Sequence, residues 1–397
     1  MIPLPWAAVV AGVAGSLMLP LEPRHGGRAA VAGRVAMLAP LVLLVAFPGE
    51  SPERAALTAA LVIALLARRA HDSFHTECAL KVLWVVGAAL ALSMAGQELL
   101  TALTGTSRPG EQWAILGLDL DPRALWRTAL PLTLIVGLVM LGAAPFHFWP
   151  SDVLQGGFPA LAPLAVVALQ AAGAGWLRWR LAGVGACPEA AIQAAHVLEA
   201  VCAIGFMVGA ATLLVQRQPE RRAGALAGLQ GALLLAALAA SQRLSGFGVS
   251  ATAAALDRWG AHLALALTGA AILARFTPAA TAEPGAAAVI FRRHPWSAGA
   301  GLYAHLSLAG VPGTPGAFLW FAVARDLTRS APVWVVAAML GAWIAAFVSA
   351  MAHVRAVCGV RSPAPPTATS VPLPARAALW VCGVALVAEF AARLTGR

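Results

Sequence analysis

The sequence alternates long apolar runs with short polar gaps. About twelve of these runs approach the length of about 20 residues that an α-helix needs to cross the hydrocarbon core of a bilayer. They cover residues 5–20, 30–47, 55–70, 79–103, 126–146, 158–177, 190–215, 221–241, 249–275, 297–325, 332–356 and 374–393. The pattern predicts an all-α, polytopic membrane protein. We expect the first run to be retained, because it lacks a basic start and a convincing cleavage site.

Two of the runs contain residues that interrupt helices. Proline removes a backbone donor and glycine weakens a helix, so Pro145, Pro312 and Pro315 are each predicted to open a turn. Both breaks fall in the fifth helix of a five-helix run. Paired broken helices in corresponding places are typical of a transporter-type internal repeat with its pathway at mid-membrane. Two ordinary proline kinks would leave the same pattern.

The composition excludes a soluble enzyme. Hydrophobic residues make up 60% of the 397 residues and charged residues only 11%, too few to cover a soluble core. The formal charge of +10 comes from basic residues scattered through the gaps, which favours membrane topology over nucleic-acid binding. The five cysteines form no CxxC pair and no cluster with histidine. We therefore expect no metal site, no cofactor and no nucleic-acid partner.

A few polar residues lie within the predicted helices. His147 and Asp152 flank Trp149 at the first break, where water can enter, so they are candidates for proton handling or for capping freed backbone groups. Glu199 and His196 are three residues apart and share a helix face. They are candidates for a proton relay, a structural pair or a helix contact. Four more polar residues are expected to be satisfied by backbone carbonyls or interfacial water: His262, His305, His353 and Glu389.

Three stretches resemble antiporter-like subunit N of proton-pumping NADH:quinone oxidoreductase, respiratory complex I. They are TECALK at 76–81, APFHFWPSDV with its Gly- and Pro-rich continuation at 144–159, and LSLAGVPGTPG at 306–316. They occur in the family's order, so the resemblance covers roughly residues 55–393. It implies two inverted, antiporter-like five-helix repeats in the inner (cytoplasmic) membrane. The resemblance also implies other membrane subunits as partners, with the NADH and quinone chemistry in other chains.

The resemblance also suggests a division of the chain into four parts. Members of the family usually have more helices before the run at 55–70 than the sequence printed here can form. The parts are shortened N-terminal helices at 1–54, a first bundle at 55–180, a second bundle at 181–358, and a linker with a terminal helix at 359–397.

The family's proton-relay positions hold side chains that do not titrate in this chain. Burial can bring the pKa of a lysine close to neutral pH, whereas arginine does not deprotonate in proteins. The chain has a single lysine, Lys81. By resemblance, the relay lysines fall on Met140, Gln170 and Trp320, and the relay histidine falls on Gln230. Proton translocation is therefore expected to be reduced or lost.

Three functions remain open at this point. The chain is a subunit N-type membrane subunit of a complex I-like assembly, or an antiporter-like subunit of another ion-coupled complex. That second group includes cation/proton antiporters, membrane-bound hydrogenases and inorganic-carbon uptake complexes. The third function is a non-conducting structural spacer, which the missing lysines favour.

Overall fold

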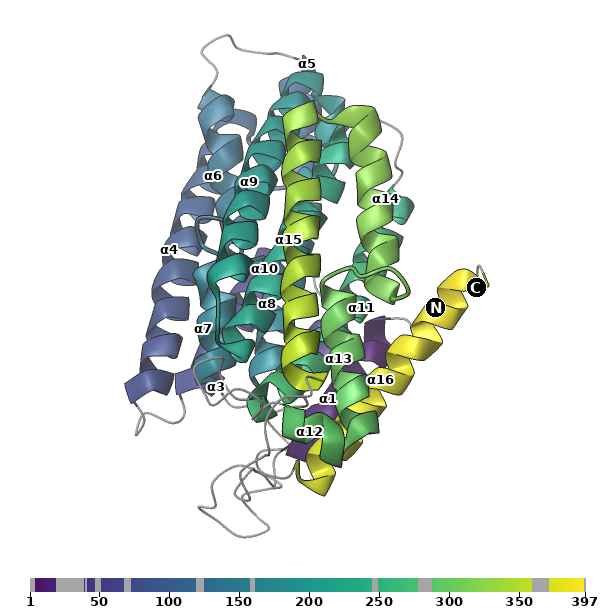
Figure 1. Ribbon diagram of the computed structural model, residues 1–397. Coiled ribbons are helices and arrows are strands. Elements are labelled where there is room, and N and C mark those ends of the chain that lie inside the picture. The colour runs from purple at the N-terminus through teal and green to yellow at the C-terminus, as the bar shows by residue number, and fades with distance from the viewer. Residues whose placement is uncertain are drawn as a thin grey trace.

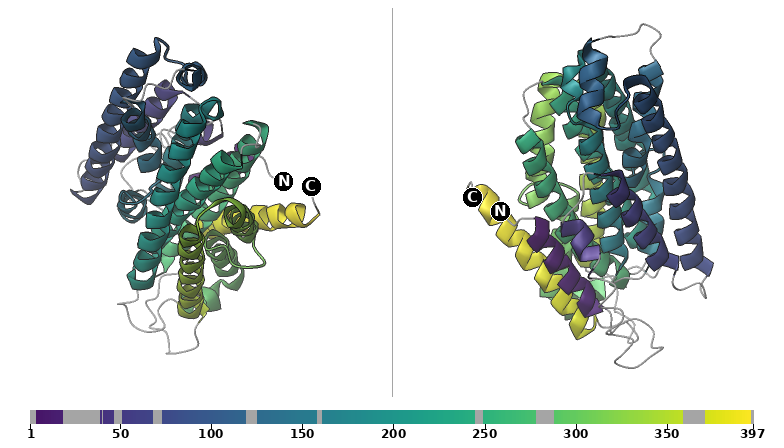
Figure 2. Two further views of the ribbon diagram at one scale, coloured as in Figure 1. Left: turned by 90° about the horizontal axis from the view of Figure 1, so that it is seen from above. Right: turned by 180° about the vertical axis from the view of Figure 1, so that it is seen from behind.

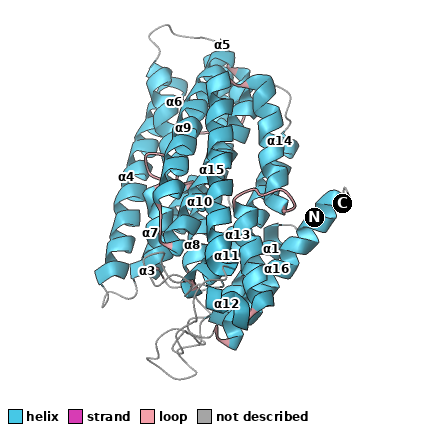
Figure 3. Ribbon diagram, in the orientation of Figure 1, coloured by secondary structure: helices cyan, strands magenta, loops and turns pink. Residues whose placement is uncertain are grey.

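The chain is a bundle of helices that run side by side, with no strand in the residues that can be described (Figures 1 and 3). The computed structural model describes residues 4–18, 39, 41–46, 51–67, 73–118, 125–157, 161–244, 249–277, 288–358 and 371–395. Within these residues, 6 helices are long and apolar enough to cross a membrane. They are Thr76–Thr104, Pro188–Val215, Pro219–Arg243, Asp257–Phe276, Val333–Cys358 and Leu373–Leu394. The expected all-α, multi-pass membrane fold is confirmed.

The helices of the first half pack around α4 and α8. The elements are α1 (Leu4–Met18), α3 (Pro52–Ala67), α4 (Ser73–Thr104), α5 (Pro109–Leu118), α6 (Leu125–Met140), α7 (Phe148–Gly156) and α8 (Ala162–Leu181). Helix α6 packs against both α4 and α8, and α3 closes the other side of the same pair. The short α7 instead packs mainly against α10 of the second half. The second piece of the first broken helix therefore contacts both halves of the chain.

The helices of the second half pack around α10, α11 and α13. They are α9 (Pro188–Val215), α10 (Pro219–Arg243), α11 (Val249–Phe276), α12 (Ala288–Arg293), α13 (Pro295–Leu308), α14 (Pro315–Ser330), α15 (Val333–Cys358) and α16 (Leu373–Leu394). Seen from above, α9 and α10 lie between the early helices and α13–α16 (Figure 2). The first and last described helices, α1 and α16, lie against each other and against α11 (Figure 2).

Both predicted breaks are present, and both fall between the ends of the bundle (Figure 1). The first separates α6 from α7 and contains Pro145. The second separates α13 from α14 and contains Pro312. Pro315 does not open a turn as predicted. It is the first residue of α14, a position where its missing N–H has no helical partner to lose.

The sequence pattern missed helix α5, which lies in a stretch predicted to be a polar gap. Its Trp113 is buried and donates an indole hydrogen bond of 3.1 Å to the carbonyl oxygen of Arg180. The Arg180 guanidinium lies over the Trp113 ring at 4.9 Å and donates to the side-chain oxygens of Gln97 and Gln112, at 2.8 Å each. These contacts fix α5 across the ends of α4 and α8. Only one of the predicted runs, 30–47, lies largely outside the described residues.

Candidate functional site at the helix breaks

The two breaks begin with the same backbone turn. Gly142 and Gly310 both have φ +69, a left-handed conformation that favours glycine. At each turn, the two N–H groups that follow the helix bond back to its last carbonyls, which is the Schellman arrangement. The bonds are Gly142 to Val139 at 2.9 Å, Ala143 to Leu138 at 3.1 Å, Gly310 to Ser307 at 3.0 Å and Val311 to Leu306 at 3.0 Å. Glycine therefore ends each first half-helix, although the sequence analysis assigned the breaks to proline.

A glutamine from α8 caps the first break. The Gln170 side-chain nitrogen donates to the carbonyl oxygen of Leu141 at 2.8 Å and to that of Ala227 on α10 at 3.0 Å. The Trp149 indole donates to the carbonyl oxygen of Val139 at 2.8 Å. The last carbonyls of a helix have no partner within the helix, and burying them without one is costly. These two side chains satisfy that need.

A glutamine from α10 does the same at the second break. The Gln230 side-chain nitrogen donates to the carbonyl oxygen of Leu308 at 2.7 Å. The Trp343 indole on α15 donates to the carbonyl oxygen of Gly310 at 2.9 Å. Each break is therefore held by one glutamine amide and one tryptophan indole, all neutral groups.

The other two positions to which the resemblance assigned a relay residue, Met140 and Trp320, are packed as core. Met140 is fully buried at the end of α6. Trp320 is fully buried on α14, stacks on Trp343 at 5.5 Å between ring centroids and lies 6.1 Å from the ring of Phe206. Apolar and aromatic contacts of this kind stabilise the bundle and carry no ionisable group.

Asp152 is the centre of a charged cluster at the first break. Its carboxylate lies 3.0 Å from Lys81 Nζ on α4 and 3.1 Å from Arg221 Nη2 on α10, and Glu77 lies 2.7 Å from the same lysine. Asp152 itself is buried, while both of its cationic partners are partly exposed. The carboxylate therefore ties α4, α7 and α10 together. The sequence suggested a proton-handling or backbone-capping role and did not reveal these partners.

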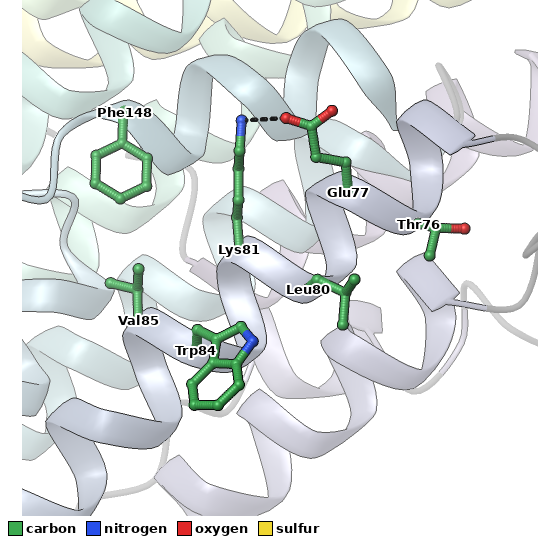
Figure 4. A pocket seen from close by; sticks show the side chains of 7 residues that line it. All are labelled: Thr76, Glu77, Leu80, Lys81, Trp84, Val85 and Phe148. Atoms are coloured by element: carbon green, nitrogen blue, oxygen red, sulfur yellow. Dashed lines mark ion pairs between the residues drawn. The ribbon is translucent and has the colours of Figure 1, made fainter.

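An open pocket lies beside this cluster. It has a volume of about 730 Å³ and is lined by Thr76, Glu77, Leu80, Lys81, Trp84, Val85 and Phe148. Figure 4 shows Lys81 and Glu77 pointing toward each other, with the Phe148 ring on the other side of the lysine. Trp84 is 75% exposed, so the outer wall of the pocket is an apolar surface of α4.

The remaining candidates at the first break and on α9 are arranged differently from expectation. His147 precedes α7 and makes no side-chain capping bond to that helix. Glu199 contacts a neighbouring helix and does not pair with His196. Both oxygens of Glu199 bind Arg243 on α10, at 2.9 Å each, while His196 lies on an exposed position. A buried carboxylate requires a partner, and the arginine fork supplies two hydrogen bonds where an imidazole offers one.

The isolated polar residues of the second half gather near the second break. The rings of His305 and His353 lie 4.4 Å apart between centroids. Glu389 is paired with Arg393, which donates to the carbonyl oxygen of Pro315 at 3.1 Å. Both ring nitrogens of His262 are buried without a hydrogen-bond partner among the described residues. Glu389 is therefore held by a side-chain ion pair, which its isolated position in the sequence did not indicate.

The described part of the chain contains no group of three or more His, Cys, Asp or Glu side chains placed to hold a metal ion. Its cysteines are free, and all but Cys358 are buried.

The chain has sequence relatives of known kind, although no family model matches it. It is 27% identical over 339 residues to NADH-quinone oxidoreductase subunit N of Paenibacillus sp. (strain JDR-2), covering 82% of this chain and 63% of the relative. It is 30% identical over 294 residues to NADH-quinone oxidoreductase subunit N of Xanthomonas euvesicatoria pv. vesicatoria (strain 85-10), covering 70% and 57%. The chain thus spans less than two thirds of the length of these relatives.

Solved structures share its fold over nearly the whole chain. A chain of respiratory complex I from Thermus thermophilus with bound aureothin matches with a TM-score of 0.72 and 22% identity, covering 98% of this chain and 84% of that chain. A chain of the membrane-bound sulfane sulfur reductase, an archaeal respiratory membrane complex, matches with a TM-score of 0.73 and 15% identity, covering 99% and 80%.

The fold and the two capped breaks define a multi-pass membrane protein of the antiporter-like kind found among complex I membrane subunits. Its curated sequence relatives are NADH-quinone oxidoreductase subunit N, so the resemblance seen in the sequence is confirmed.

Proposed function

We propose that the chain is a subunit N-type membrane subunit of a complex I-like NADH:quinone oxidoreductase, in which proton translocation through this subunit is reduced or lost. The observation that carries this proposal is the pair of glutamine caps. Gln170 and Gln230 occupy two of the family's relay positions and donate their amides to Leu141 and Leu308 at the breaks. A side-chain amide neither gains nor loses charge near neutral pH, so the breaks are capped by groups that do not titrate.

The substituted positions support the same conclusion from packing. An ionisable relay needs a polar or hydrated surrounding, because an isolated charge inside a membrane is costly. Met140 is enclosed by the core, and Trp320 is held between aromatic rings. All four positions assigned to the relay by resemblance therefore hold neutral side chains, and two of them are packed as core.

The charged groups that remain stay candidates for residual proton handling. Asp152 and Glu199 each form an ion pair with an arginine, which holds its proton. His147 lies at the first break with its Nδ1 buried and without a partner among the described residues. His196 lies on the exposed side of α9. In the proposed function, Asp152 and Glu199 hold helices together, and any proton uptake at the first break involves His147.

The proposed location is the inner (cytoplasmic) membrane, with lipid and other membrane subunits as neighbours. Large apolar side chains are exposed along the outer faces of α4, α9 and α15, including Trp84, Met207 and Ile344. Exposed apolar surface on spanning helices is stable only against lipid or another membrane helix. We further propose that residues 55–180 and 181–358 are the two five-helix bundles, flanked by residues 1–54 and 359–397.

A second candidate is a subunit of another energy-coupled membrane complex. The likeness to a chain of the archaeal sulfane sulfur reductase extends over 99% of this chain, as fully as the likeness to complex I. In that case the fold is kept, and the electron-transfer partner is a different module. A structural spacer role is compatible with either assembly.

Purification of the full-length chain with its partners tests the proposal. A tagged chain is expressed in its native host, extracted in a mild detergent, and its partners are identified by mass spectrometry against an untagged control. The proposal predicts recovery of other complex I-type membrane subunits together with NADH- and quinone-binding subunits. Recovery of a hydrogenase or sulfur-reducing module would support the second candidate, and recovery of the chain alone would contradict both.

A further inference from the structure

Arg180, at the end of α8, is a cation buried inside the protein without an anionic partner among the described residues. Its side chain is 0% exposed. Charged side chains are almost never fully buried unless they are paired, because an isolated charge is costly to remove from water. Two carboxylates on the neighbouring helices α4 and α5, Glu98 and Glu111, are on exposed positions, and Glu111 pairs with Arg108 at 3.0 Å. Within the described part of the chain, no carboxylate forms an ion pair with Arg180.

The described contacts of the Arg180 guanidinium are all with neutral groups. Nη1 donates to Oε1 of Gln97 and to Oε1 of Gln112, at 2.8 Å each, and the Trp113 ring lies 4.9 Å away. Nε and Nη2 are buried and have no hydrogen-bond partner among the described residues. These two nitrogens form one edge of the planar group, and their N–H bonds on that edge point in the same direction. The guanidinium therefore presents a complete donor edge to which none of the described groups bonds.

The two glutamines are oriented to accept from Arg180, but they do not neutralise it. Nε2 of Gln97 donates to the carbonyl oxygen of Ser107 at 3.0 Å, and Nε2 of Gln112 donates to the carbonyl oxygen of Thr106 at 2.6 Å. These bonds fix each amide with its oxygen toward the arginine. An amide oxygen carries only a partial negative charge, so the positive charge of the guanidinium remains to be balanced.

Helix α5 closes this site at the end of the bundle. Gly117 packs so closely on η2 (Val184–Ala186) that a Cβ on this glycine would lie 2.2 Å from the carbonyl oxygen of Ala186. Arg108, immediately before α5, has a side chain that is 81% exposed, so this end of the bundle faces water (Figure 1). A ligand of the enclosed site is therefore small and enters from the aqueous side.

We propose that the Nε–Nη2 edge of Arg180 binds a small monovalent inorganic anion, chloride in the cell. One negative charge balances the buried positive charge, and charge-assisted hydrogen bonds satisfy the free edge. A water molecule would accept the same bonds and leave the charge unbalanced, and a lipid headgroup does not reach a fully enclosed side chain. The bound anion joins α5 to α4 and α8, so the stability of this junction depends on it. The site lies within this chain and is independent of the proposed assembly.

Thermal unfolding of the full-length chain in detergent tests the proposal. Chloride replaces gluconate stepwise at a constant ionic strength of about 0.15 M, so that general screening of charges stays the same. A ligand that binds only the folded chain stabilises it with rising concentration, and we expect a saturating increase of at least about 2 °C in the unfolding temperature. Bromide is expected to act like chloride. Equal unfolding temperatures in chloride and in gluconate would overturn the proposal.

Two substitutions are expected to remove the chloride dependence for opposite reasons. Arg180→Gln removes the buried charge, whereas Gln97→Glu places a carboxylate beside Nη1 and balances that charge from within the chain. Arg108→Gln removes an exposed arginine at the same end of the bundle and is the control, expected to keep the full chloride response. An unchanged response in either of the first two variants, or a response lost in Arg108→Gln, would contradict the assignment to Arg180.

Direct binding measurements decide the question even if Arg180→Gln does not fold. Binding of ³⁶Cl⁻ to the unmodified chain in lipid nanodiscs is expected to saturate at about one anion per chain, with displacement by bromide and none by gluconate. Gln97→Glu is expected to bind the label at least about tenfold less tightly. Absence of saturable binding, or equal binding by Gln97→Glu, would overturn the proposal. The partners recovered with the chain have no bearing on this result, so failure here is distinct from failure of the proposed function.

Discussion

Gln230 donates its side-chain amide to the carbonyl oxygen of Leu308 over 2.7 Å, and both residues are fully buried. The end of a half-helix carries partial negative charge on its unpaired carbonyls. The charge state of a titratable side chain at this place would depend on that negative charge. An amide donates a hydrogen bond to the carbonyl without a change of protonation. The contact explains how the end of the broken helix is stabilised without a charged side chain beside it.

Removing the amide of Gln230 is expected to destabilise the chain. Gln230→Leu leaves the Leu308 carbonyl buried without its donor, and a buried unsatisfied group costs about 1–3 kcal/mol. Thermal unfolding in detergent measures the loss. Gln242→Leu, at the partly buried end of the same helix, is the control and is expected to unfold near the temperature of the unmodified chain. Equal unfolding temperatures for the two variants would show that the hydrogen bond from Gln230 to Leu308 does not stabilise the chain.

The left-handed turn at the second break is expected to tolerate only glycine. In Gly310→Ala the new Cβ would lie 2.1 Å from Trp320 Cδ1, and the φ of +69 adds a backbone cost of about 1–2 kcal/mol. We expect a large loss of folded protein in fluorescence-detected size exclusion. Gly341→Ala, in the middle of α15 where a Cβ meets nothing within 4 Å, is the matched control and is expected to behave like the unmodified chain or better. A well-folded Gly310→Ala variant would contradict the turn.

The charged cluster at Asp152 is expected to hold α7 in place. Asp152→Asn leaves Lys81 and Arg221 without their shared carboxylate. We expect the free energy of unfolding to fall by about 1–3 kcal/mol. The loss is smaller than for a fully buried ion pair, because both cations are partly exposed. A double-mutant cycle with Arg221→Gln measures the coupling through unfolding free energies. Glu111→Gln, which removes an exposed ion pair with Arg108, serves as control and is expected to have little effect. Additive single and double changes would mean that Asp152 and Arg221 do not interact.

Glu199 is expected to act as a structural partner of Arg243. Glu199→Gln should destabilise the α9–α10 contact, because the carboxylate is buried and makes both bonds of the arginine fork. Glu189→Gln, on the same helix but in an exposed pair with Arg127, is the comparison and should be nearly neutral. Protection of α9 and α10 amides from hydrogen exchange reports the difference. If His196→Asn weakened this protection as much as Glu199→Gln, the pairing first suggested by the sequence would have to be restored.

Much of the fold could be predicted because long apolar runs have few alternatives in a membrane. The broken helices were found from Pro145 and Pro312, but the residues that set the turns, Gly142 and Gly310, were not singled out. Glycine is so common in these helices that its left-handed positions do not stand out in a single sequence. Helix α5 was missed for a related reason: its stability comes from Arg180 and Trp113, which are 67 positions apart in the chain.

The site was harder to predict than the fold because its contacts join distant segments. The positions of Gln170 and Gln230 came from resemblance, and their roles as caps required knowledge of which carbonyls face them. The partners of Asp152 and Glu199 lie on other helices, and nothing in local spacing indicates Arg221 or Arg243. Histidines that looked isolated along the chain, such as His305 and His353, come together only when α13 packs against α15.

Proton translocation by the assembled complex shows whether protons pass Gln170 and Gln230, two of the positions to which the resemblance assigned a relay residue. Membrane vesicles containing the assembly are used to measure protons translocated per NADH oxidised, with the unmodified chain and with Gln170→Met and Gln230→Met combined. Methionine keeps the size of the side chain and removes the amide. We expect the same ratio for both, per assembled complex. A lower ratio in the double variant would show that protons pass these two positions and would contradict this expectation.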